Sequence, residues 1–408
     1  TIVVSRGAFR RGLRCTPTPL CRIPLIKHVT TENTDTVLCD RCPTEFLPDR
    51  PPPDEAIHNV YELKTQSELV RYYHAAAGFP TKPSWLKAIK NKQYASWPGL
   101  TWEAVNKNFP ESEETLKGHG RKTRSGLRST KVTPQIDDEE ESEEATKLTR
   151  PPTKQKEAII RIYDLSDETE RLMYTDQTGR FPQKSSRGNQ YIMVLIEIDS
   201  NAILVEAMKN RTTGEMIRAY QVLVNHLRNA GVTPKMHILD NECSAEFKER
   251  IKSNNMQYQL VPPHDHRRNI AEKAIQVFKA HFISILCGVD KSFPLHLWDR
   301  LLGQAEHTLN MLRTSKMTPT VAAYAYLWGE HDYNANPFAP LGCKVEVHVT
   351  PGTRETWAPH TASGFYIGNA WEHYRCHEIY ICDTKHMQSC LTVFFKHKYL
   401  TMPTITPA

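Results

Sequence analysis

Three carboxylates stand where strand or helix patterns begin or end. Asp176 closes the strand-like run RLMYTD, Asp240 closes KMHILD, and Glu272 lies in the first turns of a helix-period run that starts near Asn269. Singly, such an Asp is commonly a turn or helix cap, and such a Glu favours the helix dipole. If the three converge, they repel one another unless a divalent cation neutralises them, and oxygen ligands favour Mg²⁺ or Mn²⁺. Joint placement would therefore create a metal site.

The elements around these acids predict the fold. After the strand ending at Asp176, apolar runs of strand length occupy 190–199 and 202–208, and a helix with a Thr N-cap candidate and a terminal Gly follows over 212–231. A strand over 235–240, a short helix, the strand MQYQLVP and the helix of Glu272 complete the order. This order predicts an α/β sheet with helices on both sides. Asp176 and Asp240 would share one sheet edge if the first and fourth strands are neighbours.

Composition divides the 408 residues into five segments, with 39% hydrophobic and 24% charged residues overall. The predicted segments are a flexible leader (1–55), a helical module (56–115), a charged linker (116–156), the α/β core (157–325) and a β-rich C-terminal region (326–408). No run has the length of a membrane span, and no signal segment opens the chain, so we expect an intracellular protein. The first residue is Thr, so we also expect a piece of a longer product.

The net charge of +6 permits nucleic-acid binding without requiring it, and its distribution carries more information. The segment from Lys117 to Lys131 holds six Lys or Arg, among them Arg121, Lys122 and Arg124, and Asp137 to Glu144 is acidic. Such blocks are normally solvated tethers, and the basic one could equally grip nucleic-acid phosphates.

Ten cysteines are too few for a disulfide scaffold, and we interpret them mostly as reduced thiols. Cys39 and Cys42 have metal-ligand spacing, but the spacing between Cys15 and Cys21 does not repeat it. Free cysteines in a leader are the favoured interpretation.

The core motifs carry a resemblance to a known family. YTDQTGRFPQKSSRGNQY, LDNECSAEF and NIAEKAIQVFKAHF, in this order, resemble the catalytic core of retroelement integrases, most closely the copia-type retrotransposon class. MTPTVAAYAYLWG and PFAPLGCKVEVHV followed by GFYIGN resemble the family's downstream segments. The resemblance covers about Tyr61 to Thr401.

This resemblance implies an RNase H-like fold that binds two metal ions, Mg²⁺ or Mn²⁺, trims the DNA ends of the element and joins them to target DNA. It implies Asp176, Asp240 and Glu272 as the catalytic and metal-binding triad. It also implies DNA as partner, a homo-oligomer, and a location in the nucleus or a retroelement particle. Asn241 and Asn269 match asparagines of the family's motifs.

Further candidates for DNA contact surround Glu272. Gln276 and Lys279 follow by four and seven residues and share its helix face, whereas Ala274, Val277, Phe278 and Ile285 turn elsewhere. The cluster before the helix could line a DNA channel or form an exposed basic turn. It contains His264, His266, Arg267 and Arg268.

The sequence departs from the family in two places. Only 31 residues separate Asp240 from Glu272, a few short of the usual spacing, and Glu242 replaces a common glycine. The segment from Tyr72 to Ile89 resembles a zinc-binding module in which His58 and His74 could be ligands, but no cysteine lies between Cys42 and Cys243. We therefore expect no zinc there, and expect Trp85, Trp97 and Trp102 to form a core.

The C-terminal runs KVEVHV, SGFYIGN, EIYICD and CLTVFF predict a small β-barrel. Trp371, Tyr374 and Arg375 could stack on or grip DNA, but core packing is the favoured interpretation for aromatic residues in a small barrel.

Three functions stay open on sequence alone. The intact acid triad favours an active integrase. The missing zinc ligands and the absent Met favour an inactive relic that retains DNA binding. An RNase H nuclease would share the acids but would not need the flanking modules.

Overall fold

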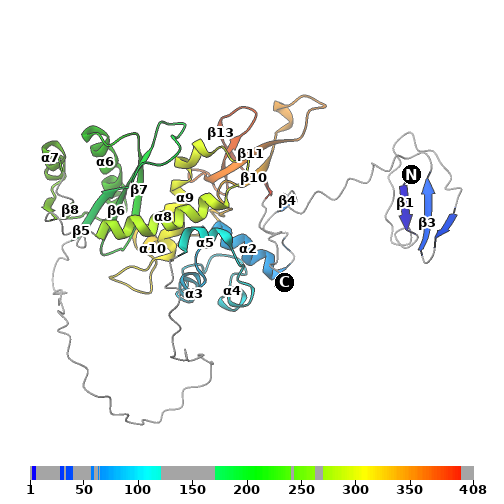
Figure 1. Cartoon of the computed structure of the whole chain (residues 1–408), viewed down its shortest axis with the longest axis horizontal. Helices are drawn as coiled ribbons and strands as arrows, with labels where there is room; N and C mark the ends of the chain where they lie inside the picture. The colour runs from blue at the N-terminus through cyan, green and yellow to red at the C-terminus, as the bar shows by residue number, and fades with distance from the viewer. Residues whose placement is uncertain are drawn as a thin grey trace, which may run out of the picture.

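A computed structural model of the chain describes residues 63, 65–120, 171–239, 243–261 and 270–396, together with the backbone of four short strands before them (Figure 1). Those four strands are β1 (Ile2–Ser5), β2 (His28–Thr31), β3 (Thr34–Cys39) and β4 (Ile57–His58). The first three form an antiparallel sheet in the order β1-β3-β2. No helix in these described parts is long and apolar enough to cross a membrane.

The central sheet has five strands in the order β7-β6-β5-β8-β9. Their bounds are β5 Leu172–Gln177, β6 Tyr191–Glu197, β7 Ile203–Met208, β8 Met236–Leu239 and β9 Gln257–Leu260. β6 runs antiparallel to β5 and β7, whereas β5, β8 and β9 are parallel. This mixed order, third-second-first-fourth-fifth, is that of an RNase H-like fold, and it confirms the predicted fold class.

Helices cover both faces of this sheet, as predicted. The helices α6 (Thr213–Asn229) and α7 (Ala245–Ser253) share one hydrophobic core with the sheet. The helices α8 (Ile270–Gly288) and α9 (Leu302–Leu312) share the other core, and Figure 1 shows α8 lying across the sheet. Because side chains alternate along a strand, β5, β6, β7 and β8 contribute to both cores.

Helix α6 shows how local sequence sets these elements. Tyr220, Leu223 and Leu227 recur at spacings of three and four residues, and all three are fully buried. Thr212 occupies the N-cap position with an extended backbone, as predicted. Gly231 follows the helix with φ of +75°, a conformation that glycine adopts without a steric penalty.

Four helices form the unit before the sheet. They are α2 (Gln66–Ala76), α3 (Lys82–Lys90), α4 (Trp102–Asn108) and α5 (Glu113–His119). Trp85 and Trp97 are buried in its core, which confirms two of the three predicted core tryptophans. The prediction was wrong for Trp102, which is 37% exposed. Trp102 is the first residue of α4, and side chains tilt toward a helix N-terminus, so its ring points beyond the layer on which Val105 packs.

This helical unit packs directly on helices α8 and α9. A Cβ on Gly118 of α5 would lie 1.9 Å from Ser284 Oγ and 2.4 Å from the Ala280 carbonyl of α8, so only glycine fits this contact. Gln304 of α9 donates to the Ala339 carbonyl at 2.9 Å and accepts from the Tyr366 hydroxyl at 2.7 Å. One continuous hydrophobic core therefore runs from the helical unit through the sheet to the C-terminal strands.

The C-terminal region is β-rich, as predicted. The strands β10 (Lys344–His348), β11 (Thr361–Asn369), β12 (His377–Ile381), β13 (Met387–Cys390) and β14 (Val393–Lys396) form a barrel-like antiparallel sheet. Its order is β13-β12-β11-β10-β14-β4, so β4, which contains His58, pairs at one edge. CLTVFF was expected to be one strand, but it spans the end of β13 and the start of β14, because the chain turns between Cys390 and Val393.

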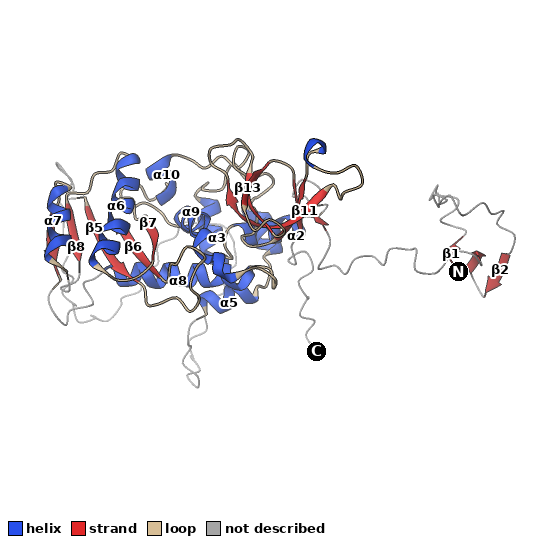
Figure 2. Cartoon of the chain, turned by 90° about the horizontal axis from the view of Figure 1, so that it is seen from above, coloured by secondary structure: helices blue, strands red, loops and turns tan. Residues whose placement is uncertain are grey.

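The shorter helices η5 (Leu295–Arg300) and α10 (Ala323–Trp328) lie between the central and C-terminal sheets in the chain. A third, η6 (Pro351–Thr353), lies between β10 and β11. Figure 2 shows the two sheets at opposite ends of the folded part, with α9 between them. The predicted domain boundaries, including the leader and the charged linker, stay a prediction.

Candidate active site

Asp176 lies at the carboxyl end of β5, the central strand of the sheet. The residue is partly exposed, and one of its carboxylate oxygens, Oδ1, accepts the backbone N–H of Gln177 at 2.7 Å. The buried residues Met173, Tyr174 and Thr175 precede it on the strand. The strand therefore leaves the core at Asp176, and this carboxylate lies where the carboxyl ends of the parallel strands meet the edge of the sheet.

The first and fourth strands are neighbours, which confirms the condition set by the sequence. Leu172, Met173 and Tyr174 of β5 pair in parallel with Met236, His237 and Ile238 of β8. Thr175 Oγ1 and His237 Nε2 lie 2.8 Å apart, and both residues are buried. Burial lowers the pKa of His237 to about 3, so the ring is neutral. This hydrogen bond joins the two strands just before Asp176.

The alternation of side chains assigns Asp176 to one face of the sheet. Met173 belongs to the core under α6 and α7, whereas Tyr174 belongs to the core under α8. Asp176 is two residues beyond Tyr174 and so shares its face. The helix that carries Glu272 packs on that same face.

Helix α8 separates a polar stripe from an apolar face, as predicted. Glu272, Gln276 and Lys279 are exposed. Ala274, Phe278 and Ile285 are buried, and Val277 is half-buried. Glu272 in the first turn is therefore held by a helix whose opposite face is anchored in the core.

The remaining predicted site residues lie outside the described residues. They are Asp240, Asn241, His264, His266, Arg267, Arg268, Asn269, Arg121, Lys122 and Arg124. In the part of the chain that the structure describes, no group of three or more His, Cys, Asp and Glu side chains is arranged to hold a metal ion. Asp176 and Glu272 themselves offer accessible carboxylate oxygens, the donor type that Mg²⁺ and Mn²⁺ bind.

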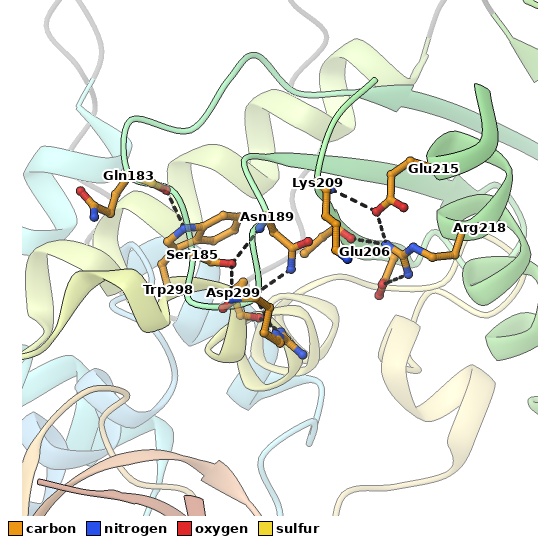
Figure 3. A network of polar contacts seen from close by, with 11 residues as sticks. Gln183, Ser185, Asn189, Glu206, Lys209, Glu215, Arg218, Trp298 and Asp299 are labelled. Carbon is orange, nitrogen blue, oxygen red and sulfur yellow. Dashed lines mark hydrogen bonds and ion pairs between the residues drawn. The ribbon is translucent and has the colours of Figure 1, made fainter. Parts of the chain in front are cut away.

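A buried polar network, which the sequence did not indicate, holds the loop that follows Asp176 (Figure 3). Asp299 of η5 is 3% exposed, and its Oδ2 accepts from Arg187 Nε and Asn189 Nδ2, both at 2.8 Å. The Trp298 indole donates to the Gln183 carbonyl at 2.9 Å. These bonds fix the connection from β5 to β6 against the helical layer. A lone acid in the apolar run LHLWDR is the signal that could have revealed it.

His74, one of the two histidines considered as zinc ligands, is enclosed by aromatic rings. It contacts Phe79, Trp85 and Phe109 at centroid distances of 4.9 to 5.7 Å, and its Nε2 donates to the Pro80 carbonyl at 2.8 Å. Burial lowers its pKa to about 4. The hydrogen bond of this nitrogen therefore stabilises the fold of the helical unit.

The C-terminal aromatic residues correct a prediction. Trp371 and Tyr374 were expected to be core residues, but they are 52% and 71% exposed. They lie in the turn between β11 and β12, outside the alternation that buries strand residues. Arg375 in the same turn has φ of +58°, and its backbone N–H bonds the Ala335 carbonyl at 3.0 Å.

No protein-family model matches the chain, and no curated protein matches it. Among solved structures, the simian T-cell lymphotropic virus intasome in complex with PP2A regulatory subunit B56 gamma matches at 17% identity, over 54% of this chain and 78% of that chain, with a TM-score of 0.28. The catalytic core domain of BIV integrase matches at 14% identity, over 39% and 94%, with a TM-score of 0.30.

The HTLV-2 integrase catalytic core domain in complex with magnesium matches at 20% identity, over 40% of this chain and 97% of that chain, with a TM-score of 0.30. Such TM-scores are too low to decide function. The strand order and the side chains of Asp176 and Glu272 therefore define the candidate site.

Proposed function

We propose that the chain is a retroelement integrase of the copia type, which trims DNA 3′ ends and joins them to target DNA. The observation that carries the proposal is the parallel pairing of β5 with β8 beneath the helix that bears Glu272. The sequence resemblance names three acids, and this topology is the one in which such acids can meet.

The register of the β5–β8 pairing relates position 176 to position 240. Residues 172, 173 and 174 pair with 236, 237 and 238, a constant offset of 64 positions. The same offset, continued by two residues, relates position 176 to position 240. Leu239 belongs to the core on the far face, so alternation assigns position 240 to the face of α8. We infer that Asp240 stands beside Asp176 on that face.

Helix α8 supplies the third acid. Its buried residues Ala271, Ala274 and Phe278 fix the helix on the sheet, and Glu272 lies in its first turn. A rigid helix holds a carboxylate more accurately than a loop does, and metal sites depend on such accuracy.

Asp176, Asp240 and Glu272 would hold two Mg²⁺ or Mn²⁺ ions, which activate the attacking oxygen and stabilise the leaving one when bound. Phosphoryl transfer asks the protein mainly for positioning and charge stabilisation. The three acids meet this need through fixed carboxylate oxygens, and the Asp299 network holds the loop beside them.

The polar stripe on α8 is the proposed contact with the DNA end. Gln276 and Lys279 continue the exposed face of Glu272. A Lys beside the acids can contact a phosphate, and a Gln can donate to a phosphate or a base edge. The candidates outside the described residues would extend this surface: Asn241, His264, Arg267, Arg268, Asn269, Arg121, Lys122 and Arg124. We further propose that the protein acts as a homo-oligomer on element ends and target DNA, in the nucleus or a retroelement particle.

The test is strand transfer of a labelled DNA end into plasmid with Mg²⁺ or Mn²⁺, for the chain and its Asp240→Asn variant. Joined product that disappears with Asp240→Asn is expected. The exposed Asp383 provides the matched control, since Asp383→Asn should join as the parent does.

DNA binding without joining by either protein, across several end sequences, would replace this proposal with the inactive relic. Glu242 and the short spacing before Glu272 are compatible with either outcome, a shorter loop with intact activity or a decayed copy. Cleavage of an RNA–DNA hybrid without joining would instead indicate a nuclease.

A further inference from the structure

A groove runs along the outer edge of β7, the strand at one end of the central sheet. Its charged half is a cavity of about 670 Å³ between β7, α6, α9 and β12. Its aromatic half is a cavity of about 280 Å³ lined by His226, Asn229, Gly303, Glu306, His307, Tyr324, Trp328 and Trp371. Both halves share His226, Gly303 and Glu306, so they form one continuous surface, here named the β7 groove.

The aromatic half is built from rings on three elements. His307 of α9 stacks on Tyr324 at 3.6 Å and 17°, and on Trp371 at 5.2 Å and 9°. Trp328 is tilted by 40° to Tyr324 at 5.1 Å. Trp328 and Trp371 are 37% and 52% exposed, so ring surface remains open to solvent in a folded, ordered cluster. Exposed aromatic faces of this kind attract cations through the ring quadrupole.

Among the described residues, one carboxyl group and no Lys or Arg line this half. Glu306 accepts the Val205 backbone N–H through Oε2 at 2.7 Å. Burial raises the pKa of Glu306 to about 8, so this carboxyl group is mostly protonated at neutral pH and would ionise when a cation binds beside it. Burial also lowers the pKa of His307 well below its usual value, so this ring is neutral and does not repel a cation.

The charged half carries no excess of positive charge. Five acidic side chains line it, namely Glu206, Glu215, Asp299, Glu306 and Glu378, and with Glu306 protonated the other four balance the four cations Arg187, Lys209, Arg218 and Arg300. Two of these cations are already engaged. Arg218 pairs with Glu206 at 2.8 Å and with Glu215 at 2.9 Å (Figure 3). Arg187 pairs with Asp299 at 2.8 Å. The groove is therefore free of the positive excess of a chain whose net charge is +6.

The backbone of β7 is not open to an added strand. Asn310 accepts a hydrogen bond from the Ile203 N–H and donates one to the Ile203 carbonyl. Glu306 accepts from the Val205 N–H, and Arg218 donates to the Ala207 carbonyl. Side chains of the same chain therefore already hydrogen-bond the backbone groups of β7 with which a partner strand would have to pair. A ligand of this groove must therefore bind through a side chain rather than through strand pairing.

We propose that the β7 groove binds an arginine side chain of a partner polypeptide, with the guanidinium stacked on Trp371 and hydrogen-bonded to Glu306. Guanidinium is planar, stacks on aromatic faces, and donates several hydrogen bonds to carboxylates. Nucleic acid fits less well, because none of the described residues that line the aromatic half is a Lys or Arg that could pair with a phosphate. The proposal holds whether or not the chain joins DNA.

The experiment follows tryptophan signals by ¹⁹F NMR in the full chain labelled with 5-fluorotryptophan, assigned by single Trp→Phe variants. The probe is a Gly-Ser peptide with one central arginine, and its control carries citrulline, which has the same shape without the charge. The arginine peptide should shift the Trp328 and Trp371 signals saturably and leave Trp357, which is 97% exposed, unchanged. The citrulline peptide should shift none of them.

Two variants sharpen the result. Glu306→Gln retains an acceptor for the Val205 N–H and should weaken binding of the arginine peptide at least about fivefold. Trp371→Ala, in which binding is followed through the Trp328 signal, should weaken it to the same extent. Glu372→Gln, an exposed acid next to Trp371 that lines neither half, should leave binding unchanged. Equal shifts from both peptides, no shift from either, or shifts from oligo(dT) in place of the arginine peptide would overturn the proposal.

Discussion

The helical unit and the sheet edge both resemble metal sites in sequence, yet the structure builds them in opposite ways. In the helical unit, His74 is buried among aromatic rings, and its Nε2 donates to a backbone carbonyl. At the sheet edge, Asp176 is partly exposed and Glu272 is exposed, each on an element anchored by apolar neighbours. The same kind of sequence signal, a residue type that can bind metal, therefore stands in a desolvated core in one region and at the solvent boundary in the other.

The two regions differ in how far their polar groups are exposed to solvent. The carboxylates of Asp176 and Glu272 at the sheet edge are at least partly exposed to solvent, so replacing them should alter activity and leave the free energy of unfolding unchanged. Polar groups in the helical unit are desolvated, so changing its core should alter stability. The following predictions test this division.

Glu272→Gln should abolish joining, by about 10⁴-fold or about 5.5 kcal/mol in barrier, because a proposed metal ligand loses its charge. Its midpoint of thermal unfolding should stay within about 1 °C of the parent, since the side chain is exposed. Strand-transfer rates and thermal unfolding measure the two quantities. The exposed Glu355 serves as control, and a Glu272→Gln protein that joins normally would remove this residue from the site.

Trp85→Ala should destabilise the chain by about 3–5 kcal/mol, because a fully buried indole leaves a cavity in the aromatic core. Trp357→Ala removes a ring that is 97% exposed and should cost less than about 0.5 kcal/mol. Urea unfolding compares the two. Similar costs for both would show that the helical unit lacks the packed core described above.

Stability should fall as pH decreases from about 6.5 toward 4. Burial lowers the pKa of His74, His331 and His377 to about 4 and that of His237 and His281 to about 3, so the unfolded chain binds protons that the folded chain excludes. Each histidine therefore contributes stability above pH 6.5 and loses it at about 1.4 kcal/mol per pH unit below that value.

The contribution of one histidine can be isolated by substitution. His74→Gln should reduce the pH slope by about one proton between pH 6.5 and 4, whereas His360→Gln, at an exposed position, should leave it unchanged. Urea unfolding at pH 7.5, 6 and 5 measures the slopes. An unchanged slope for His74→Gln would mean that this ring is protonated in the folded state.

Gly118→Ala should cost about 1–3 kcal/mol, because the new Cβ meets Ser284 Oγ and the α8 backbone where the helical unit packs. Gly214→Ala, in helix α6 with no atom within 4 Å of the new Cβ, should be neutral or slightly stabilising. Thermal unfolding of both variants tests whether the unit depends on this contact. Equal effects would show that the close approach of α5 to α8 is not required.

Much of this architecture could be read from local patterns. The eight-element order of the sheet and the two faces of α8 followed from periodicity and fold rules, whereas the adjacency of the strands before Asp176 and Asp240 was a condition that the structure then met. The exposed rings of Trp102, Trp371 and Tyr374 did not, because exposure at helix starts and turns depends on neighbours distant in sequence. The Asp299 and Glu306 contacts were also missed, since each acid pairs with groups about 100 residues away.

The most direct measurement for the central claim is strand transfer by Asp176→Cys in Mg²⁺ and in Mn²⁺. Replacing a carboxylate with a thiolate weakens a site for the hard Mg²⁺ ion more than for the softer Mn²⁺ ion. If Asp176 holds the metal ion during joining, product should be lost in Mg²⁺ and at least partly regained in Mn²⁺, while the parent joins in both. Joining by the variant in Mg²⁺ at the parent's rate would contradict the account.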